Sequence, residues 1–491
     1  MKVFELLVKN HIFAYDLTKL NRTMRKNLMM LLMAFVSCMP LMAAENTPQP
    51  EMNEGFPGGK CTLYRLTLTD KKGTPYSISK PQAYLSKKAI ERRKKQGLAI
   101  DSTDLPINPA YLNGIQAVGV QIKSKSKWNN TVVVRVTDDA IVQKLLALPY
   151  VKSALKVWSS PEKVEEQTRT IFNQELEPKA GTPEDDYGAA YLNIDMVNGR
   201  KLHEMGYKGK GITIAVFDGG FMNVDKLPMM KSVNILGSKD FNAFPVETIF
   251  AEEDHGTKVL STIAMNQKGV FVGTAPEASF WLMRTEDNAT ETLVEEDYWA
   301  AAAEFADSIG VDIITSSLGY QDFDDKEMDH TYVELDGSHA LISCTASMLS
   351  SKGIIHVNSA GNEGNDLWKK IGFPADAHDI LAVGALKPNK KNANFSSVGP
   401  SQDGRVKPDI MSLGSPAAVV SGRGKINNDM GTSFAAPIIA GMVASLWQSA
   451  PNKTAHEVMD AIRRSGDTAD APNNVFGYGI PDFEKAYQLL H

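Results

Sequence analysis

Two different spacings of apolar residues divide the chain at about residue 160. In the first part, strands are indicated by alternating apolar and polar residues or by β-branched residues, at Thr62–Leu68, Val132–Val136 and Val151–Val157. Helical spacing runs from Ser86, a preferred N-cap, to Gly97, a helix stop, and recurs in a second segment for which Thr137 is the predicted cap. These elements predict a small α+β unit at residues 56–158.

Near-continuous apolar runs take over beyond residue 186 and alternate with helical patterns. The predicted strands are Gly211–Gly220, Val311–Gly319, Gly353–Asn362 and Asp379–Ala385. The predicted helices are Val294–Ser308, Ser433–Gln448 and Ala455–Arg464. This alternation predicts an α/β unit at 186–491, with a parallel central sheet flanked by helices, and functional residues gather where such strands end. Residues 159–185 are polar and contain several prolines, which predicts a linker open to proteolysis.

One apolar segment opens on a small polar corner, in "MGTSFAAPIIAGMVASLW" at Met430–Trp447. Its Ala and Gly content is typical of a buried helix packed closely against its neighbours. Pro437 is expected in the first turn, where backbone N–H groups have no partner within the helix. Ser433 is then expected at the positive end of the helix dipole, which suits negative charge, and an N-capping serine is the alternative.

Polar residues at four element ends have the chemistry needed to hydrolyse an amide. They are Asp218 at a strand end, His255 before a helical run, Asn362 at a strand end and Ser433 at a helix start. Hydrolysis through serine requires an attacking hydroxyl, an imidazole that moves its proton, a carboxylate that orients the imidazole, and donors for the oxyanion. Each residue has a structural alternative, such as a turn cap, a surface histidine or a left-handed turn residue. Their joint occurrence beside glycines favours the hydrolytic site.

From about Tyr187 onward the chain resembles the subtilisin-like serine protease family. The resemblance is carried, in the family's order of Asp, His, Asn and Ser, by "YKGKGITIAVFDGGF", "DHGTKVLSTIA", "TSSLGY", "VNSAGNEGN", "FPADAHDILAVGA", "NFSSVGP", "VKPDI" and "GTSFAAPIIAGMVA". It implies a catalytic triad and two oxyanion donors, the Asn362 side-chain amide and the Ser433 backbone N–H. The implied triad is Asp218, His255 and Ser433. The residues implied to bind substrate are Ser317, Leu318, Gly319, Ala360 and Gly361.

The resemblance implies a secreted serine endopeptidase that cleaves protein or peptide substrates and requires no cofactor for its chemistry. The first unit resembles, by position and pattern, the prodomain that assists folding and then inhibits such proteases, so a self-processed zymogen is expected. Two residues depart from the family pattern. Gly219 replaces the hydroxyl residue after the catalytic Asp, and Tyr320 replaces a glycine and is expected to narrow or reshape the pocket for the side chain before the cleaved bond.

Two rival functions were weighed against the endopeptidase. The alternative that Gly219 leaves open is a catalytically impaired subtilisin-fold protein that binds peptides. An esterase of the α/β-hydrolase type is excluded, because Ser433 is not part of a G-x-S-x-G elbow and the order of the catalytic residues is reversed.

Net charge and the first residues bear on partners and localisation. A net charge of −6 argues against a nucleic-acid partner. Basic residues after Met24, then an apolar run and small residues, predict an export signal within residues 1–44, with Met24 as the true start. The protein is then expected to be secreted, periplasmic or in the cell envelope, either soluble or tethered to a membrane by lipidation of Cys38. No other segment is long and apolar enough to be a transmembrane helix.

Two charged segments have competing interpretations. The basic run Arg92–Lys95 is interpreted as a solvated helix face, with a processing site or an anion patch as alternatives. The acidic segment Gln321–Gly337 is interpreted as a solvated loop, and its alternatives are attraction of basic substrates or a structural calcium site. Only Cys61 and Cys344 follow the signal, and no Cys/His spacing resembles a zinc site.

Overall fold

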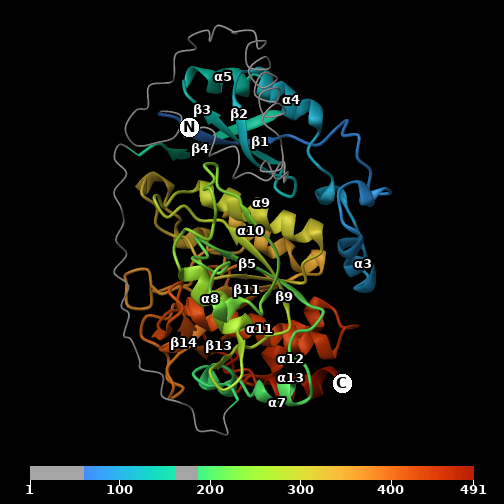
Figure 1. Ribbon diagram of the computed structural model, residues 1–491. Helices are drawn as coiled ribbons and strands as arrows, with labels where there is room; N and C mark the ends of the chain where they lie inside the picture. The colour runs from blue at the N-terminus through green and yellow to red at the C-terminus, as the bar shows by residue number, and fades with distance from the viewer. Residues whose placement is uncertain (1–59, 162–185) are drawn as a thin grey trace, which may run out of the picture. The chain divides into compact units, whose positions relative to one another are not determined.

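The computed structural model of the chain describes residues 60–161 and 186–491 (Figure 1). The predicted export signal, with Met24 and Cys38, and most of the predicted linker at 159–185 lie outside the described residues. All described residues belong to one unit of the chain, residues 52–491.

The first described part is a four-stranded antiparallel sheet with helices, as the α+β pattern predicts. Its strand order is β2-β3-β1-β4. The strands are β1 (Thr62–Leu68), β2 (Gln121–Ser126), β3 (Thr131–Val136) and β4 (Val151–Ser159). The helices are α3 (Lys87–Lys95), α4 (Pro109–Ala117) and α5 (Ala140–Leu146), with the 3-10 turns η2 (Pro81–Ala83) and η3 (Ser102–Asp104). The sequence "QIKSKS" of β2 holds one apolar residue, so hydrophobic alternation does not predict this strand.

Both faces of this sheet are covered, although the alternation in β1 predicts one solvated face. Leu66 and Leu68 pack in the core of the first part, whereas Leu63, on the other face, packs in a cluster with residues of the second part. Arg65 lies on the same face as Leu63, is 8% exposed, and pairs with Asp297 of the second part. The face expected to meet water is therefore an interface within the chain.

Local capping explains where two helices of this part begin. The Ser86 hydroxyl accepts a hydrogen bond from the Ala89 N–H at 3.2 Å, so α3 begins where the sequence predicts. The predicted cap Thr137 is wrong. The Ala140 N–H instead donates to the Asp138 carboxylate at 2.9 Å, and α5 begins only at Ala140.

The basic run at the end of α3 is not a solvated helix face, and that interpretation is corrected here. Arg92 and Arg93 are 6% and 1% exposed, whereas Lys94 and Lys95 are exposed. Successive residues of a helix point in different directions, so a run of four charges occupies more than one face. Only the two lysines face water.

The second part contains the predicted parallel sheet. Its seven strands run in the order β13-β12-β11-β10-β5-β9-β6, and the described pairings within it are parallel. The strands are β5 (Thr213–Asp218), β6 (Asn234–Asp240), β9 (Ser279–Arg284), β10 (Ile313–Ser316), β11 (Ile355–Ser359), β12 (Leu381–Leu386) and β13 (Ile410–Leu413). Two small ribbons are β7 (Asn266–Gln267) with β8 (Phe271–Val272), and β14 (Ala417–Val420) with β15 (Ile426–Asp429).

Helices cover both faces of this sheet (Figure 1). The α-helices are α6 (Tyr191–Asp195), α7 (Arg200–Glu204), α8 (His255–Ala264), α9 (Val294–Ile309), α10 (Leu341–Met348), α11 (Thr432–Ser449), α12 (Ala455–Ser465) and α13 (Phe483–Leu490). The 3-10 turns are η4 (Pro228–Met230), η5 (Lys326–Met328), η6 (Tyr332–Glu334) and η7 (Ser350–Lys352). No helix in the described ranges combines the length and apolar character needed to cross a bilayer.

Alternation along β5 shows how one strand serves two cores. Ile214 and Val216 belong to the cluster that includes α8 and α11, whereas Ala215 and Phe217 belong to the cluster that includes α9 and α10. All four are fully buried, which is why the strand reads as a continuous apolar run in the sequence.

Candidate active site

Three neighbouring strands bring the predicted site residues to one edge of the parallel sheet. Asp218 is the last residue of β5, Ser317 follows β10, and Asn362 lies three residues beyond the end of β11. β10 lies between the other two strands, and all three run in the same direction. Their carboxyl ends therefore meet, as the sequence predicts.

Asp218 and His255 form an acid–imidazole pair in which Asp218 is buried and the His255 side chain is 30% exposed. His255 begins α8, and its Nδ1 lies 3.0 Å from both carboxylate oxygens of Asp218, which is 1% exposed. The carboxylate also accepts the Gly219 N–H at 2.9 Å. Burial has the largest single effect on the pKa of His255 and lowers it. The charge and hydrogen bond of Asp218, together with the charges of Glu253 and Glu286, outweigh burial and raise that pKa to about 9.

Ser433 lies beside this pair, at the start of α11. The ring of the next residue, Phe434, is 5.7 Å from the His255 ring between centroids. The Ser433 hydroxyl donates to the Ser317 carbonyl at 3.2 Å, and among the described residues it makes no hydrogen bond to His255. Transfer of its proton to His255 therefore requires the hydroxyl to turn away from Ser317, as is common before substrate is bound.

Asn362 has one defined orientation. Its Oδ1 accepts hydrogen bonds from the Thr432 N–H at 2.9 Å and from the Thr432 hydroxyl at 3.0 Å. The amide NH₂ group therefore points away from Thr432. The Ser433 N–H belongs to the first turn of α11, where backbone donors have no partner in the helix. An amide donor and a backbone donor are thus available in this corner.

Pro437 leaves one backbone carbonyl of α11 free to accept a hydrogen bond from the segment after β10. It is the sixth residue of the helix and lies beyond the predicted first turn, because α11 begins at Thr432. A residue at this position normally donates its N–H to the Ser433 carbonyl, and proline has no N–H. The Ser317 hydroxyl donates to that carbonyl instead, at 2.8 Å. Ser317 and Ser433 are therefore joined by two hydrogen bonds, one in each direction.

The residues implied to bind substrate lie in the two segments that follow β10 and β11. Ser317 and Leu318 are largely buried, and Gly319 is exposed. Ala360 is fully buried, and the Gly361 N–H donates to the Thr432 hydroxyl at 3.3 Å. Both segments are thereby held beside the start of α11.

Tyr320 is not an exposed wall of this pocket. It is 1% exposed, its backbone pairs with Phe373, and its ring stacks on Phe323 at 6.1 Å between centroids. The Tyr320 side chain packs in the core with Phe323 and Phe373, and its effect on the shape of the pocket stays a prediction.

A buried chain of polar side chains behind these segments was not found from the sequence. The Ser316 hydroxyl donates to Asn358 Oδ1 and lies 2.8 Å from His356 Nε2, so the neutral His356 donates through Nε2. Burial lowers the pKa of His356 to about 3. The Asn358 NH₂ group donates to the carbonyls of Leu318, at 3.2 Å, and Ser359, at 2.7 Å. These hydrogen bonds hold the segment after β10 against the segment after β11.

Period-two alternation does hint at this polar chain. Ser316, His356 and Asn358 stand at positions where a strand buried on both faces normally carries apolar residues. A buried polar residue at such a position needs a hydrogen-bond partner. Polar residues at apolar positions of a strand are therefore the signal that could have identified these hydrogen-bonded side chains.

Gly219 is accounted for by close packing beside Asp218. A Cβ at this position would clash with the Glu253 carboxylate and would lie 2.7 Å from Asn288 Oδ1. The hydroxyl residue expected from the family pattern would therefore require the ends of the Glu253 and Asn288 side chains to shift.

Three carboxylates lie close together beside His255. One oxygen from each of Asp218, Glu253 and Glu286 lies within 4.8 Å of the others. Burial and the neighbouring carboxylates raise the pKa of Glu286 well above its usual value. Asp218 already accepts from His255 and Gly219, so this group of carboxylates is part of the acid–imidazole site.

The acidic segment Gln321–Gly337 contains η5 and η6, and several of its polar groups bind neighbouring protein groups. The Asp329 carboxylate accepts the Phe323 N–H at 2.7 Å, and His330 Nε2 lies 2.6 Å from the Glu296 carboxylate. Among the described residues, the carboxylates close enough to share a cation lie beside His255 and not in this segment. A calcium ion in the segment remains a prediction.

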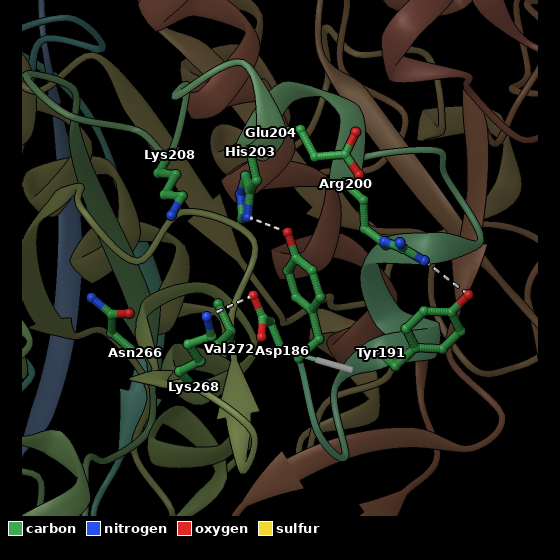
Figure 2. Close-up of a pocket in the computed structure, with 10 residues that line it drawn as sticks. Asp186, Tyr191, Arg200, His203, Glu204, Lys208, Asn266, Lys268 and Val272 are labelled. Carbon is green, nitrogen blue, oxygen red and sulfur yellow. Dashed lines mark hydrogen bonds and ion pairs between the residues drawn. The ribbon is translucent and has the colours of Figure 1, made fainter. Parts of the chain in front are cut away.

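A cavity of about 610 Å³ lies elsewhere in the second part, and Figure 2 shows its lining. Two of its charged groups pair with each other, Lys268 and Asp186 at 3.0 Å, and Arg200 donates to the Tyr191 hydroxyl at 3.0 Å (Figure 2). The described residues that line it include no serine or cysteine. This cavity holds none of the predicted site residues.

Comparisons with known proteins agree with the geometry. A model described as the subtilase family matches residues 209–479, more than half of the chain, and one described as the Peptidase S8 propeptide domain, Bacteroidota, matches residues 63–173. Subtilisin NAT of Bacillus subtilis subsp. natto is 29% identical over 288 residues, which cover 58% of this chain and 68% of that protein.

A second similar protein, the human membrane-bound transcription factor site-1 protease, is much longer than this chain's match to it. It is 29% identical over 302 residues, which cover 59% of this chain but only 26% of that protein. Subtilisin E of Bacillus subtilis (strain 168) is 28% identical over 288 residues, with 58% of this chain and 68% of that protein covered. The chain belongs to the subtilase family, and a propeptide domain of the type found in Bacteroidota precedes its subtilase domain.

Proposed function

We propose that the protein is an exported serine endopeptidase made as a zymogen. The observation that carries this proposal is the Asp218–His255 pair at the same sheet edge as Ser433 and Asn362. Membership of the subtilase family and the propeptide match support it.

In the proposed reaction, Ser433 Oγ attacks the carbonyl carbon of the scissile amide and gives its proton to His255 Nε2. Asp218 accepts the Nδ1–H of His255 and stabilises the imidazolium. The carbonyl oxygen becomes an oxyanion held by the Asn362 NH₂ group and the Ser433 N–H. The C–N bond then breaks as His255 protonates the leaving amine. Water attacks the acyl-enzyme, with His255 taking its proton and returning one to Ser433.

Substrate is proposed to lie between the segment after β10 and the segment after β11. Ser317, Leu318 and Gly319 form one wall, and Ala360 and Gly361 form the other. The hydrogen bonds from Asn358 to Leu318 and Ser359 support a fixed spacing of these walls. Protein or peptide substrates in an extended conformation fit such a slot.

The first part, assigned to residues 56–158, is proposed to act as the propeptide, and the linker at 159–185 is proposed to be cut during activation. Burial of Arg65 against Asp297 supports its role as a partner of the catalytic domain at 186–491. Export through the signal within residues 1–44 is part of the proposal, as is lipidation of Cys38 in its tethered form. The reaction as written uses no cofactor, and any structural calcium would act on stability.

A second candidate function is a peptide-binding protein with little or no catalysis. The observation that favours it is the hydrogen bond from Ser433 to Ser317 in place of one to His255. Gly219 also removes a hydroxyl next to Asp218.

Casein hydrolysis and the length of the purified chain distinguish the two functions. The chain without residues 1–44 is compared with Ser433→Ala and with Ser351→Ala, a matched serine on the surface. We expect casein cleavage and a new N-terminus within residues 159–185 in the parent and in Ser351→Ala, and neither in Ser433→Ala. A parent that does not cut its own linker, and that does not cleave casein even after an added protease has cut the linker, would support the peptide-binding protein.

A further inference from the structure

Helix α3 of the propeptide contacts the catalytic domain at the sheet edge opposite to the candidate active site. Its partners include Val311 and Asp312, which immediately precede β10, and Gly353, which lies just before β11. The site residues follow the other ends of the same two strands. Because these strands are parallel, the α3 contact and the active site lie at opposite edges.

Arg92 binds the ends of two helical segments at once. Its guanidinium donates to the Val311 carbonyl, to the Lys352 carbonyl at 3.0 Å, and to the Asp307 carboxylate. Asp307 lies in the last turn of α9 and Lys352 closes η7. Carbonyls at helix ends lack helical partners and carry the negative end of the dipole, so they suit a cation.

Acids and bases alternate between the two parts in the neighbouring buried cluster. Arg93 pairs with Asp307 at 3.0 Å and with Asp104 of the propeptide at 2.6 Å. Lys352 of the catalytic domain pairs with Asp104 at 3.4 Å and donates to the Thr103 hydroxyl at 2.7 Å. The side chains of Arg93, Asp104, Asp307 and Lys352 are at most 1% exposed. Each part therefore neutralises a buried charge of the other.

Shape reinforces this charge pattern. A Cβ at Gly310 would lie 2.7 Å from Lys88 Cβ, and one at Gly353 would lie 2.7 Å from Gln96 Nε2. Gln96 donates to the Gly353 carbonyl at 2.9 Å and accepts the Ala455 N–H, at the start of α12, at 2.9 Å. The helix thus fits closely against three separate connections of the catalytic domain.

We propose that this surface is a docking site separate from the active site, and that its occupant, helix α3, retains the propeptide after the linker is cut. The proposal uses the proposed function only for the cutting of the linker. Breaking a buried ion pair by removing one partner leaves an uncompensated charge and is strongly destabilising. Occupation of the substrate slot and retention of the propeptide are then separate properties, carried by opposite edges of the sheet.

The test uses the full chain with Ser433→Ala throughout, so that it does not depend on self-cleavage. A recognition sequence for a site-specific protease is placed within residues 162–185 and cut in vitro. Dissociation of the two pieces is then measured by sedimentation over a dilution series. Arg92→Ala combined with Arg93→Ala is compared with Lys94→Ala combined with Lys95→Ala, a matched pair whose side chains are exposed on the same helix.

We expect the cut parent and the lysine variant to stay associated to the same dilution, and the arginine variant to dissociate about 100-fold more readily or worse. Thermal melting of the uncut chains shows whether the arginine variant folds. If it does not, Lys88→Ala with Gln96→Ala, which removes contacts at the rim of the cluster, is expected to weaken association by roughly tenfold.

Equal dissociation of the arginine and lysine variants would overturn the proposal and assign retention to the sheet face around Arg65. If the arginine variant does not fold, the proposal is overturned when Lys88→Ala with Gln96→Ala dissociates to the same extent as the lysine variant. Failure of the proposed peptidase function has a different signature, because it appears as absent casein cleavage by the chain with Ser433 intact and leaves the dissociation result unchanged.

Discussion

Carboxylates around His255 control the protonation of the imidazole in the candidate site. Both oxygens of Asp218 lie 3.0 Å from His255 Nδ1, and Asp218 together with the charges of Glu253 and Glu286 raises the pKa of His255 to about 9 against the opposing effect of burial. Removal of a proton from Ser433 needs neutral His255. The raised pKa of this one residue therefore predicts that the enzyme is most active at alkaline pH.

We expect kcat/KM for a chromogenic peptide to rise with pH and level off near the His255 pKa of about 9. The folded-state pKa lies above the ordinary value of 6.5, so the stabilising effect of the pair is complete below pH 6.5 and is lost as pH rises through about 9. Initial rates and thermal melting over this range check both statements. A rate profile already level at neutral pH contradicts the raised pKa.

Asn362 is expected to matter for turnover far more than for binding. Replacing it by Ala removes one oxyanion donor, which costs about 100- to 1000-fold in kcat with little change in KM. Steady-state kinetics measure the split. Thr432→Ser keeps the hydroxyl that orients the Asn362 amide and serves as the control. A fall in kcat of less than about tenfold argues that Asn362 does not hold the oxyanion.

Gly219 is expected to tolerate a methyl group at a small cost in stability. In Gly219→Ala, the new Cβ would meet the ends of the Glu253 and Asn288 side chains, which are flexible and can shift, so the fold should lose less than about 1 kcal/mol. Gly319→Ala is the comparison, because the nearest atom to its Cβ is the Phe373 carbonyl oxygen at 3.4 Å, an ordinary contact. Chemical denaturation of both variants measures the difference, and a loss well above about 1 kcal/mol in Gly219→Ala would show that the Glu253 and Asn288 side chains cannot move aside.

At the scale of secondary-structure elements, β10 and β11 are linked by side chains as well as by their backbone ladder. Asn358 receives a hydrogen bond from Ser316 and donates to the carbonyls of Leu318 and Ser359. These bonds are buried, so their loss leaves groups without partners.

Asn358→Ala is therefore expected to lower the free energy of unfolding by about 1–3 kcal/mol and to raise KM for peptides. Adding Ser316→Ala should cost little more, because both residues belong to one hydrogen-bonded chain. Denaturation of the single and double variants measures this coupling. Fully additive losses would show that the two residues act independently.

For the whole molecule, the sequence predicted the class of fold and the sheet edge at which the ends of β5, β10 and β11 meet. The apolar run that ends at Asp218 is a strand buried on both faces, and parallel pairing brings its end beside Ser317 and Asn362. Motif order and strand ends were sufficient for this, because burial on both faces leaves a continuous apolar signal.

Features that depend on contacts distant in sequence could not be predicted. Arg92 and Arg93 read as a solvated run, because their partner Asp307 lies more than 200 residues away in the chain and their sequence neighbours are charged. The burial of Tyr320 also depends on the fold, because its ring packs with Phe323 and with Phe373, which lies about 50 residues further along the chain. Period and capping rules describe local structure and carry no information on such pairs.

The central claim is that His255 activates Ser433 as a nucleophile, and peptide mapping after reaction with a fluorophosphonate probe tests it most directly. We predict one covalent adduct, on Ser433, which disappears in Ser433→Ala and is formed far more slowly in His255→Ala. An unlabelled Ser433 in the folded parent after the linker is cut, or labelling unaffected by His255→Ala, would contradict the claim.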